Sequence, residues 1–191
     1  MKKVIWIDTE TTGLDKKVHG LREVAFLIEI DGYIVEEGFL YINTMTYKNE
    51  KYISKYVREN MNVDENLLCS YQNSSQQQQV FIDKLLKYVN DENPDKFQMA
   101  GFNIEFDYDF IKEWFNDIKS NVGFNDLFGY QKLDVLELVR HLKYLNLFNT
   151  KNNKLETLCK HFDIDIDAHK ALSDIQATKI LHQVLVEEFI K

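Results

Sequence analysis

"VIWIDTETTGLD", residues 4–15, joins a short apolar run to a threonine-rich turn, with two acids at the junction. The apolar run predicts a strand that is buried on both faces. Asp8 and Glu10 stand two residues apart, so their side chains share one face if the strand continues through them. Most D-x-E pairs in a chain with 31 acids are simply solvated. This pair is a site candidate because it ends a predicted central strand, where open α/β sheets bind their ligands.

The flanking sequence predicts an α/β fold. Residues 22–43 contain two β-rich runs joined at Asp31 and Gly32, a dipeptide typical of hairpins. Further strands are predicted at residues 97–103 and 130–135, and helices at residues 74–89, 107–118, 135–146, 154–162 and 171–190. A strand meander followed by strands alternating with helices predicts a mixed sheet of about five strands, antiparallel and then parallel, with helices on both faces.

Length and composition predict a single domain over residues 1–191, since 45% of the residues are apolar and no linker interrupts the chain. No apolar run approaches the ~20 residues of a membrane span, and no signal peptide is evident, so we expect a cytoplasmic protein without a membrane partner. Cys69 and Cys159 form no zinc motif. The net charge of −8 argues against a broadly basic nucleic-acid surface, but not against acids that converge on divalent cations.

Asp107 opens a predicted helix whose apolar stripe contains Phe110, Ile111 and Trp114. A step of three or four residues back along the stripe reaches Asp107 rather than Asp109, so Asp107 is expected to begin the buried face. The structural alternative is a helix N-cap, which by itself explains an aspartate near a helix start better than a site does.

Asp174 lies on the edge of the apolar stripe of the last predicted helix, beside Ala171 and Thr178. A carboxylate at such a position should be paired, protonated or bound to metal. His169 precedes this helix. A lone histidine there is more often an exposed or capping residue, and only the neighbouring acids favour a catalytic one.

The elements that carry these acids can meet at one edge of the sheet, which predicts a cluster of four carboxylates with a nearby base: Asp8, Glu10, Asp107 and Asp174, with His169. Four carboxylates cannot share a site in ionised form without cations, and an all-oxygen donor set favours Mg²⁺ or Mn²⁺. Two such ions roughly 3.5 to 4 Å apart stabilise the attacking and leaving oxygens of a phosphoryl displacement.

Three ordered motifs resemble those of the DEDDh exonucleases, the DnaQ-like family that includes the proofreading ε subunit of bacterial DNA polymerase III. "IDTETTGL" resembles the first motif, "FNIEFDYDF" the second and "HKALSD" the third, and the similarity covers nearly the whole chain. The resemblance implies a ribonuclease H-like fold. It also implies an enzyme that removes mononucleotides from a 3′ end with two divalent cations.

By position, the resemblance assigns metal binding to the four carboxylates. Asp8 would bridge both cations, Glu10 and Asp174 would hold the ion nearer the nucleophile, and Asp107 would support the second ion. His169 would be the general base, and a histidine five residues before Asp174 is what places the chain in the "h" branch.

The resemblance also implies residues that grip the terminal nucleotide: Thr11, Gly13, Leu14 as an apolar wedge, and Asn103. Asn103 stands where many relatives have histidine, and residues 57–63 lack the HGI motif that relatives often carry. Residues 47–60 interleave lysines with tyrosines, which can guide single strands. We favour instead an amphipathic helix with its tyrosines inward and its lysines in solvent.

The predicted substrate is nucleic acid with a free 3′ end, single-stranded or frayed DNA rather than RNA, and a DNA polymerase is a candidate partner. RNA or short oligoribonucleotides are the alternative within the same family. A catalytically silent nucleic-acid binder or interaction subunit is the alternative from another class, and the intact set of five residues argues against it.

Overall fold

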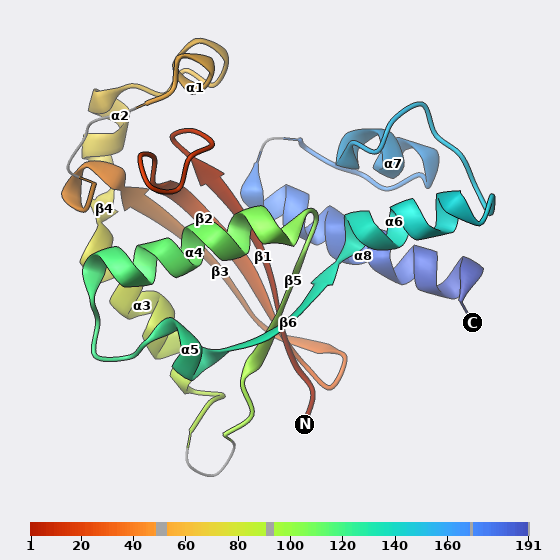
Figure 1. Cartoon of the computed structure of the whole chain (residues 1–191), viewed down its shortest axis with the longest axis horizontal. Coiled ribbons are helices and arrows are strands. Elements are labelled where there is room, and N and C mark those ends of the chain that lie inside the picture. The colour runs from red at the N-terminus through yellow and green to blue at the C-terminus, as the bar shows by residue number, and fades with distance from the viewer. Residues whose placement is uncertain (49–52, 91–93, 169, 191) are drawn as a thin grey trace.

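The structure is a computed structural model that describes residues 1–48, 53–90, 94–168 and 170–190. Within these ranges one sheet has the strand order β4-β3-β2-β1-β5-β6 (Figure 1). Its strands are β1 (Lys3–Thr11), β2 (Leu21–Ile30), β3 (Tyr33–Asn43), β4 (Gln72–Asn73), β5 (Phe97–Gly101) and β6 (Phe128–Asp134). A short 3₁₀ helix, η1 (Thr44–Thr46), follows β3. The α-helices are α1 (Lys55–Asn60), α2 (Glu65–Ser70), α3 (Ser74–Leu86), α4 (Ile104–Ile118), α5 (Phe124–Leu127), α6 (Val135–Tyr144), α7 (Leu155–His161) and α8 (Ala171–Phe189).

The sheet is antiparallel on one side of β1 and parallel on the other. β2 pairs antiparallel with both β1 and β3, whereas β5 runs parallel to β1 and β6. The hairpin between β2 and β3 turns at Asp31 and Gly32, whose φ angles of 49° and 93° suit the tight turn that this dipeptide predicts. The predicted mixed sheet is confirmed, and the two-residue β4 adds an edge strand that the sequence does not predict.

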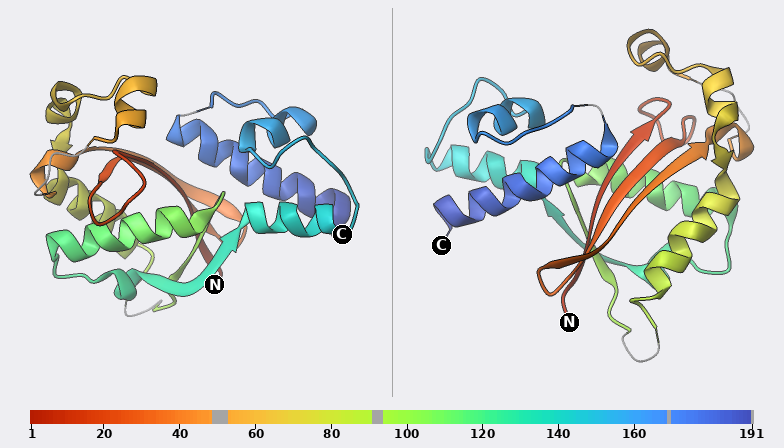
Figure 2. Two further views of the ribbon diagram at one scale, coloured as in Figure 1. Left: turned by 45° about the horizontal axis from the view of Figure 1, so that its top comes forward. Right: turned by 180° about the vertical axis from the view of Figure 1, so that it is seen from behind.

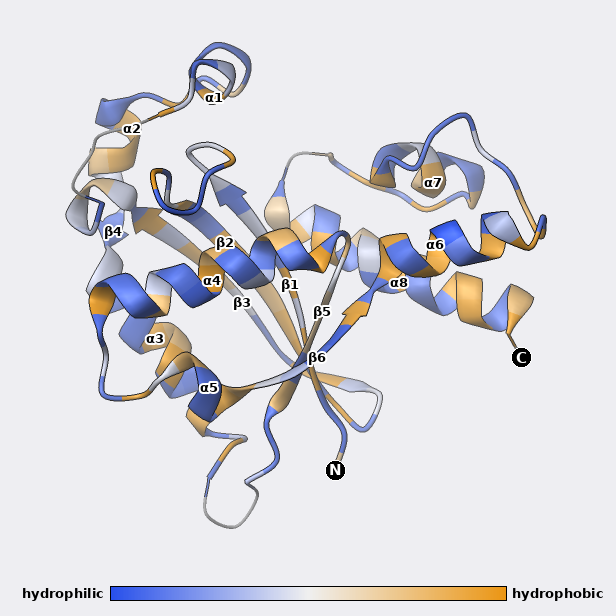
Figure 3. Ribbon diagram, viewed as in Figure 1, coloured by the Kyte–Doolittle hydropathy of each residue, from blue (hydrophilic) through white to orange (hydrophobic). Residues whose placement is uncertain are grey.

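β1 is buried on both faces, as its continuous apolar run predicts. Ile5 and Ile7 belong to a core formed with α3 and α4. Val4 and Trp6 face a second core formed with α6 and α8. Figure 2 shows these helix pairs on opposite sides of the sheet, and Figure 3 shows hydrophobic and hydrophilic residues alternating along α4.

The start of α4 differs from the prediction. The helix begins at Ile104, directly after Asn103, which has a left-handed conformation with φ of 61°. Asp107 therefore lies within the helix, and the interpretation of Asp107 as an N-cap is wrong. The expectation of inward tyrosines in residues 47–60 is wrong for Tyr56, which is 65% exposed. Residues 49–52 of that segment lie outside the described residues.

Among the helices of the described ranges, none combines the length and the apolar character that crossing a membrane requires.

Candidate active site

The end of β1 extends beyond its neighbour β5. The parallel pairing stops at Trp6 and Ala100, whereas the pairing with β2 continues to Thr11. Asp8 and Glu10 therefore lie on a strand end with a neighbouring strand on the β2 side only. Because alternate residues share a face, both side chains follow Trp6 toward the side of the sheet that α8 covers.

Asp107 of α4 occupies the place beside β1 where β5 has ended. Its Oδ1 accepts hydrogen bonds from the backbone N–H of Thr9 at 2.9 Å and from the Thr9 hydroxyl at 2.7 Å. Asp107 is 4% exposed. Asp109 is partly exposed and pairs with Lys16 instead. The prediction that the buried stripe reaches Asp107 rather than Asp109 is confirmed.

α8 brings Asp174 to the same place from the opposite side of the sheet. One carboxylate oxygen from each of Asp8, Glu10 and Asp174 lies within 4.8 Å of the other two. Asp174 stands in the first turn of α8. His169, the predicted base, lies outside the described residues, so its role stays a prediction.

Burial and mutual repulsion make these acids difficult to ionise. Burial, and then the charges of Asp107 and Asp174, raise the pKa of Asp8 well above its ordinary value of 3.8. Burial raises the pKa of Asp107 to about 7, even though the hydrogen bonds from Thr9 favour its charged form. The pKa of Glu10 is also raised by burial. Negative charge at this edge is therefore unfavourable until a cation compensates it.

Arg22 of β2 is a neighbour of the cluster that the sequence analysis missed. Its Nη2 donates to Oε2 of Glu10 at 3.0 Å, its Nη1 donates to Glu23, and its side chain is 8% exposed. This guanidinium opposes the effect of burial on the pKa of Glu10. In the sequence, Arg22 appears only as a basic residue at the start of an apolar strand. Its contact with Glu10 can be inferred only from the strand register, which places Glu10 opposite Glu23, the residue after Arg22.

The donor set fits hard divalent cations. It consists of carboxylate oxygens, which Mg²⁺ and Mn²⁺ prefer. A carboxylate has two oxygens, so Glu10 can bond to Arg22 and to a cation together. Asp107 is not in the group within 4.8 Å, but its charge is the first after burial to raise the pKa of Asp8. Asp107 therefore adds to the negative charge that a cation at this edge would compensate.

A pocket of about 590 Å³ opens beside Glu10, and three of the predicted substrate-binding residues line it: Thr11, Gly13 and Leu14. The Thr11 hydroxyl donates to the Gly13 carbonyl at 2.7 Å and so holds the turn, while Leu14 is 85% exposed. The fourth, Asn103, is exposed at the start of α4 and is not among the described residues that line the pocket. The pocket is also lined by residues that were not predicted to bind substrate: Ser54, Tyr56, Val57 and Met61.

The model of one exonuclease family, RNase_T, matches residues 5–181. The chain belongs to the RNase_T exonuclease family. This match covers all three motifs and confirms the predicted resemblance to DnaQ-like exonucleases.

This member of the RNase_T family is similar in sequence to part of a PolC-type DNA polymerase III from Oceanobacillus iheyensis. The two are 33% identical over 94 residues, which cover 49% of this chain and 6% of the polymerase. About half of this chain thus aligns with a small portion of that relative.

Its fold is similar to that of exonuclease I from two bacteria. The E. coli enzyme in complex with a dT13 oligonucleotide gives a TM-score of 0.75 at 17% identity, covering 97% of this chain and 41% of that one. Exonuclease I from Methylocaldum szegediense gives a TM-score of 0.77 at 15% identity, covering 100% of this chain and 42% of that one. These matches confirm the ribonuclease H-like fold, and this chain spans less than half of each exonuclease I.

Proposed function

We propose that this protein is a metal-dependent 3′→5′ exonuclease that releases nucleoside monophosphates from single-stranded or frayed DNA. The observation that carries the proposal is the convergence of Asp8, Glu10 and Asp174 within 4.8 Å, next to a pocket wide enough for a nucleotide. A cytoplasmic location and a working association with a DNA polymerase belong to the same proposal. The similarity to PolC supports the association.

The four carboxylates would hold two divalent cations, Mg²⁺ or Mn²⁺. Glu10 and Asp174 would hold one ion with Asp8, and Asp107 would support the other together with Asp8. When bound, the ions supply positive charge to the transition state and make an attacking water more acidic. Arg22 keeps the Glu10 carboxylate in place, and the paired hydrogen bonds from Thr9 fix the orientation of Asp107.

His169 is the general base in this proposal. It stands five residues before Asp174 and two before the start of α8. An imidazole with a pKa of about 6.5 can accept the proton that the attacking water loses near neutral pH. That proton must leave the water as the phosphodiester bond breaks, so the loss of His169 should lower kcat more than it raises KM.

The pocket receives the 3′-terminal nucleotide. Thr11 and Gly13 shape the turn that approaches the sugar and phosphate, and the exposed Leu14 packs against the last base. Asn103 contributes an amide at the edge of the site. DNA is the favoured substrate, and the similarity in fold to an exonuclease I bound to a dT13 oligonucleotide supports this choice.

Digestion of a 5′-labelled single-stranded oligodeoxynucleotide tests the proposal. We expect a ladder of products shortened from the 3′ end, release of nucleoside 5′-monophosphate, and dependence on Mg²⁺ or Mn²⁺. Asp174→Asn should remove this activity, whereas Asp165→Asn, which neutralises an exposed acid outside the cluster, should retain it. Full activity in excess chelator, or in Asp174→Asn, would contradict the proposal.

A matched oligoribonucleotide in the same assay decides the substrate class. Faster digestion of RNA than of DNA would move the assignment to the oligoribonucleotide alternative, because the chemistry is shared and only readout of the 2′-hydroxyl differs. Binding of either oligomer without product, in both Mg²⁺ and Mn²⁺, would identify a silent binding subunit instead.

A further inference from the structure

The loop between β1 and β2, residues 12–20, is held against α4 by lysines. Lys16 pairs with Asp109 at 2.5 Å and Lys17 pairs with Glu113 at 2.9 Å. These acids stand four residues apart on α4, so the two pairs follow one another by about 6 Å along the helix axis. Asp107, at the candidate active site, precedes both acids on the same helix. The pairs therefore form a row that leads away from the site.

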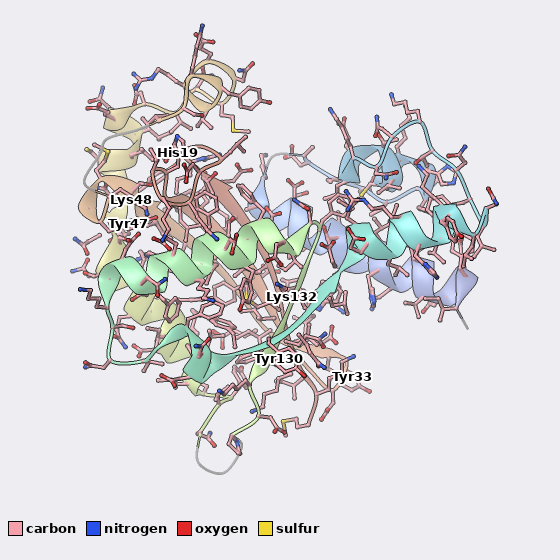
Figure 4. All side chains as sticks on the ribbon, in the orientation of Figure 1. His19, Tyr33, Tyr47, Lys48, Tyr130 and Lys132 are labelled. Atoms are coloured by element: carbon pink, nitrogen blue, oxygen red, sulfur yellow. The ribbon has the colours of Figure 1, made fainter. Side chains whose placement is uncertain are left out.

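Lys48 anchors the loop in a different way. Its Nζ lies 2.6 Å from Asp117 and donates to the Lys16 carbonyl at 2.9 Å, and its side chain is only 9% exposed. Figure 4 shows Lys48 beside the loop that carries His19. The side chains of Lys16 and Lys17 are 35% and 69% exposed. Lys48 thus has a structural role, whereas Lys16 and Lys17 are accessible to a ligand from solution.

A second groove of about 400 Å³ connects the row to the candidate active site. It shares Leu14, Asp15 and Phe106 with the pocket beside Glu10. The remainder of its wall includes the Lys16–Asp109 pair. A strand whose last nucleotide occupies the pocket has a continuous path past Leu14 to Lys16, and Lys17 is the next residue along the chain.

We propose that Lys16 and Lys17 bind backbone phosphates of the strand on the 5′ side of the scissile bond, exchanging Asp109 and Glu113 for phosphate as the strand enters. This inference rests on the proposed function. Charge complementarity supports this inference. The strand is polyanionic and the protein carries a net charge of −8, so accessible lysines near the site reduce the repulsion between them. Exposed ion pairs are weak enough for a phosphate to replace the carboxylate.

The exchange predicts opposite effects from the two halves of one ion pair. Lys16→Gln removes a phosphate contact and should raise KM for a single-stranded oligomer by about two- to fivefold, the range of an exposed ion pair. Asp109→Asn frees the lysine and should lower KM. A purely structural pair would give changes of the same sign, because either substitution breaks it. Lys17→Gln and Glu113→Gln repeat the test one helical turn further from the site.

The dependence on salt gives an independent readout. Each lost phosphate contact should reduce the slope of log KM against log salt by about 0.7 for a single strand. Lys16→Gln should show this reduction and Asp109→Asn should not. Lys84→Gln is the matched control, since Lys84 pairs with Glu36 on β3 rather than with α4. It should leave both KM and the slope unchanged.

A substrate of one nucleotide separates this inference from the proposed function. The p-nitrophenyl ester of thymidine 5′-monophosphate keeps a scissile phosphodiester but has no further phosphate on its 5′ side, so all four variants should hydrolyse it at the wild-type rate. If the wild type hydrolyses neither ester nor oligomer, the proposed function fails. If the wild type hydrolyses both, and Lys16→Gln and Asp109→Asn shift KM in the same direction or not at all, the phosphate exchange alone is refuted.

Discussion

Asp107→Asn should stabilise the metal-free protein at alkaline pH while it abolishes nuclease activity. Asp107 is 4% exposed, and burial raises the pKa of its carboxyl from 3.8 to about 7. The native state therefore holds this proton more tightly than the unfolded chain does. The associated stability is complete below about pH 4 and is lost as the pH rises through about 7. An asparagine keeps an oxygen that can accept from Thr9 but never ionises.

The size of the effect follows from the two pKa values. They differ by about 3, and each pKa unit corresponds to about 1.4 kcal/mol, so the gain at about pH 8 is at most about 4 kcal/mol. For a protein of this length, that corresponds to a rise in Tm of up to about 8–16 °C. At about pH 4 the wild-type carboxyl is neutral, and the two proteins should melt within a few degrees of each other.

Thermal unfolding followed by circular dichroism in EDTA, at about pH 4 and about pH 8, measures this difference. Asp165→Asn is the control, since it removes an exposed carboxylate. Added Mg²⁺ should make the wild type melt at a higher temperature than Asp107→Asn at pH 8, because cations stabilise the wild type and bind the variant more weakly. Equal melting temperatures at pH 8 in EDTA, or an equal gain at both pH values, would refute the electrostatic account of the cluster.

Three further predictions follow from the same site. Asp8→Ala should abolish Mg²⁺-dependent digestion with an unchanged circular dichroism spectrum, and normal digestion by this variant would rule out the metal assignment. Arg22→Gln leaves Glu10, whose side chain is 13% exposed, without its cation and should lower the free energy of unfolding in EDTA by up to about 3–5 kcal/mol, with partial recovery in Mg²⁺, as urea titration can measure. Gly13→Ala places a Cβ 2.3 Å from the His19 ring and should raise KM. His19→Ala in the same chain should restore it, and a KM that stays high would show that the contact is not the cause.

Local sequence patterns were sufficient to predict the strand and helices that carry the site residues. The two-sided burial of β1 appears as an uninterrupted apolar run, and the hairpin at Asp31 and Gly32 appears as a two-residue signal. The spacing of the apolar stripe on α4 separated the buried Asp107 from the partly exposed Asp109. These inferences succeed because strand and helix periodicities are fixed by backbone geometry within a few residues.

The order of the three motifs also identified the family, and the match over residues 5–181 confirms it. Motif order, however, does not measure distance between side chains. The convergence of Asp8, Glu10 and Asp174 within 4.8 Å requires β1 and α8 to pack together. The role of His169 stays a prediction.

The sequence by itself determined the strand and the helices that carry Asp8, Glu10, Asp107 and Asp174, although not the start of α4 or the edge strand β4. Only the tertiary structure decided the partners of those acids. Asp107 bonds to Thr9 across 98 residues because β5 ends before β1 does, and Arg22 reaches Glu10 because a particular register aligns β1 with β2. The physical reason is that periodicity is set by neighbours along the chain, whereas charge pairing and burial depend on which surfaces the completed fold brings together.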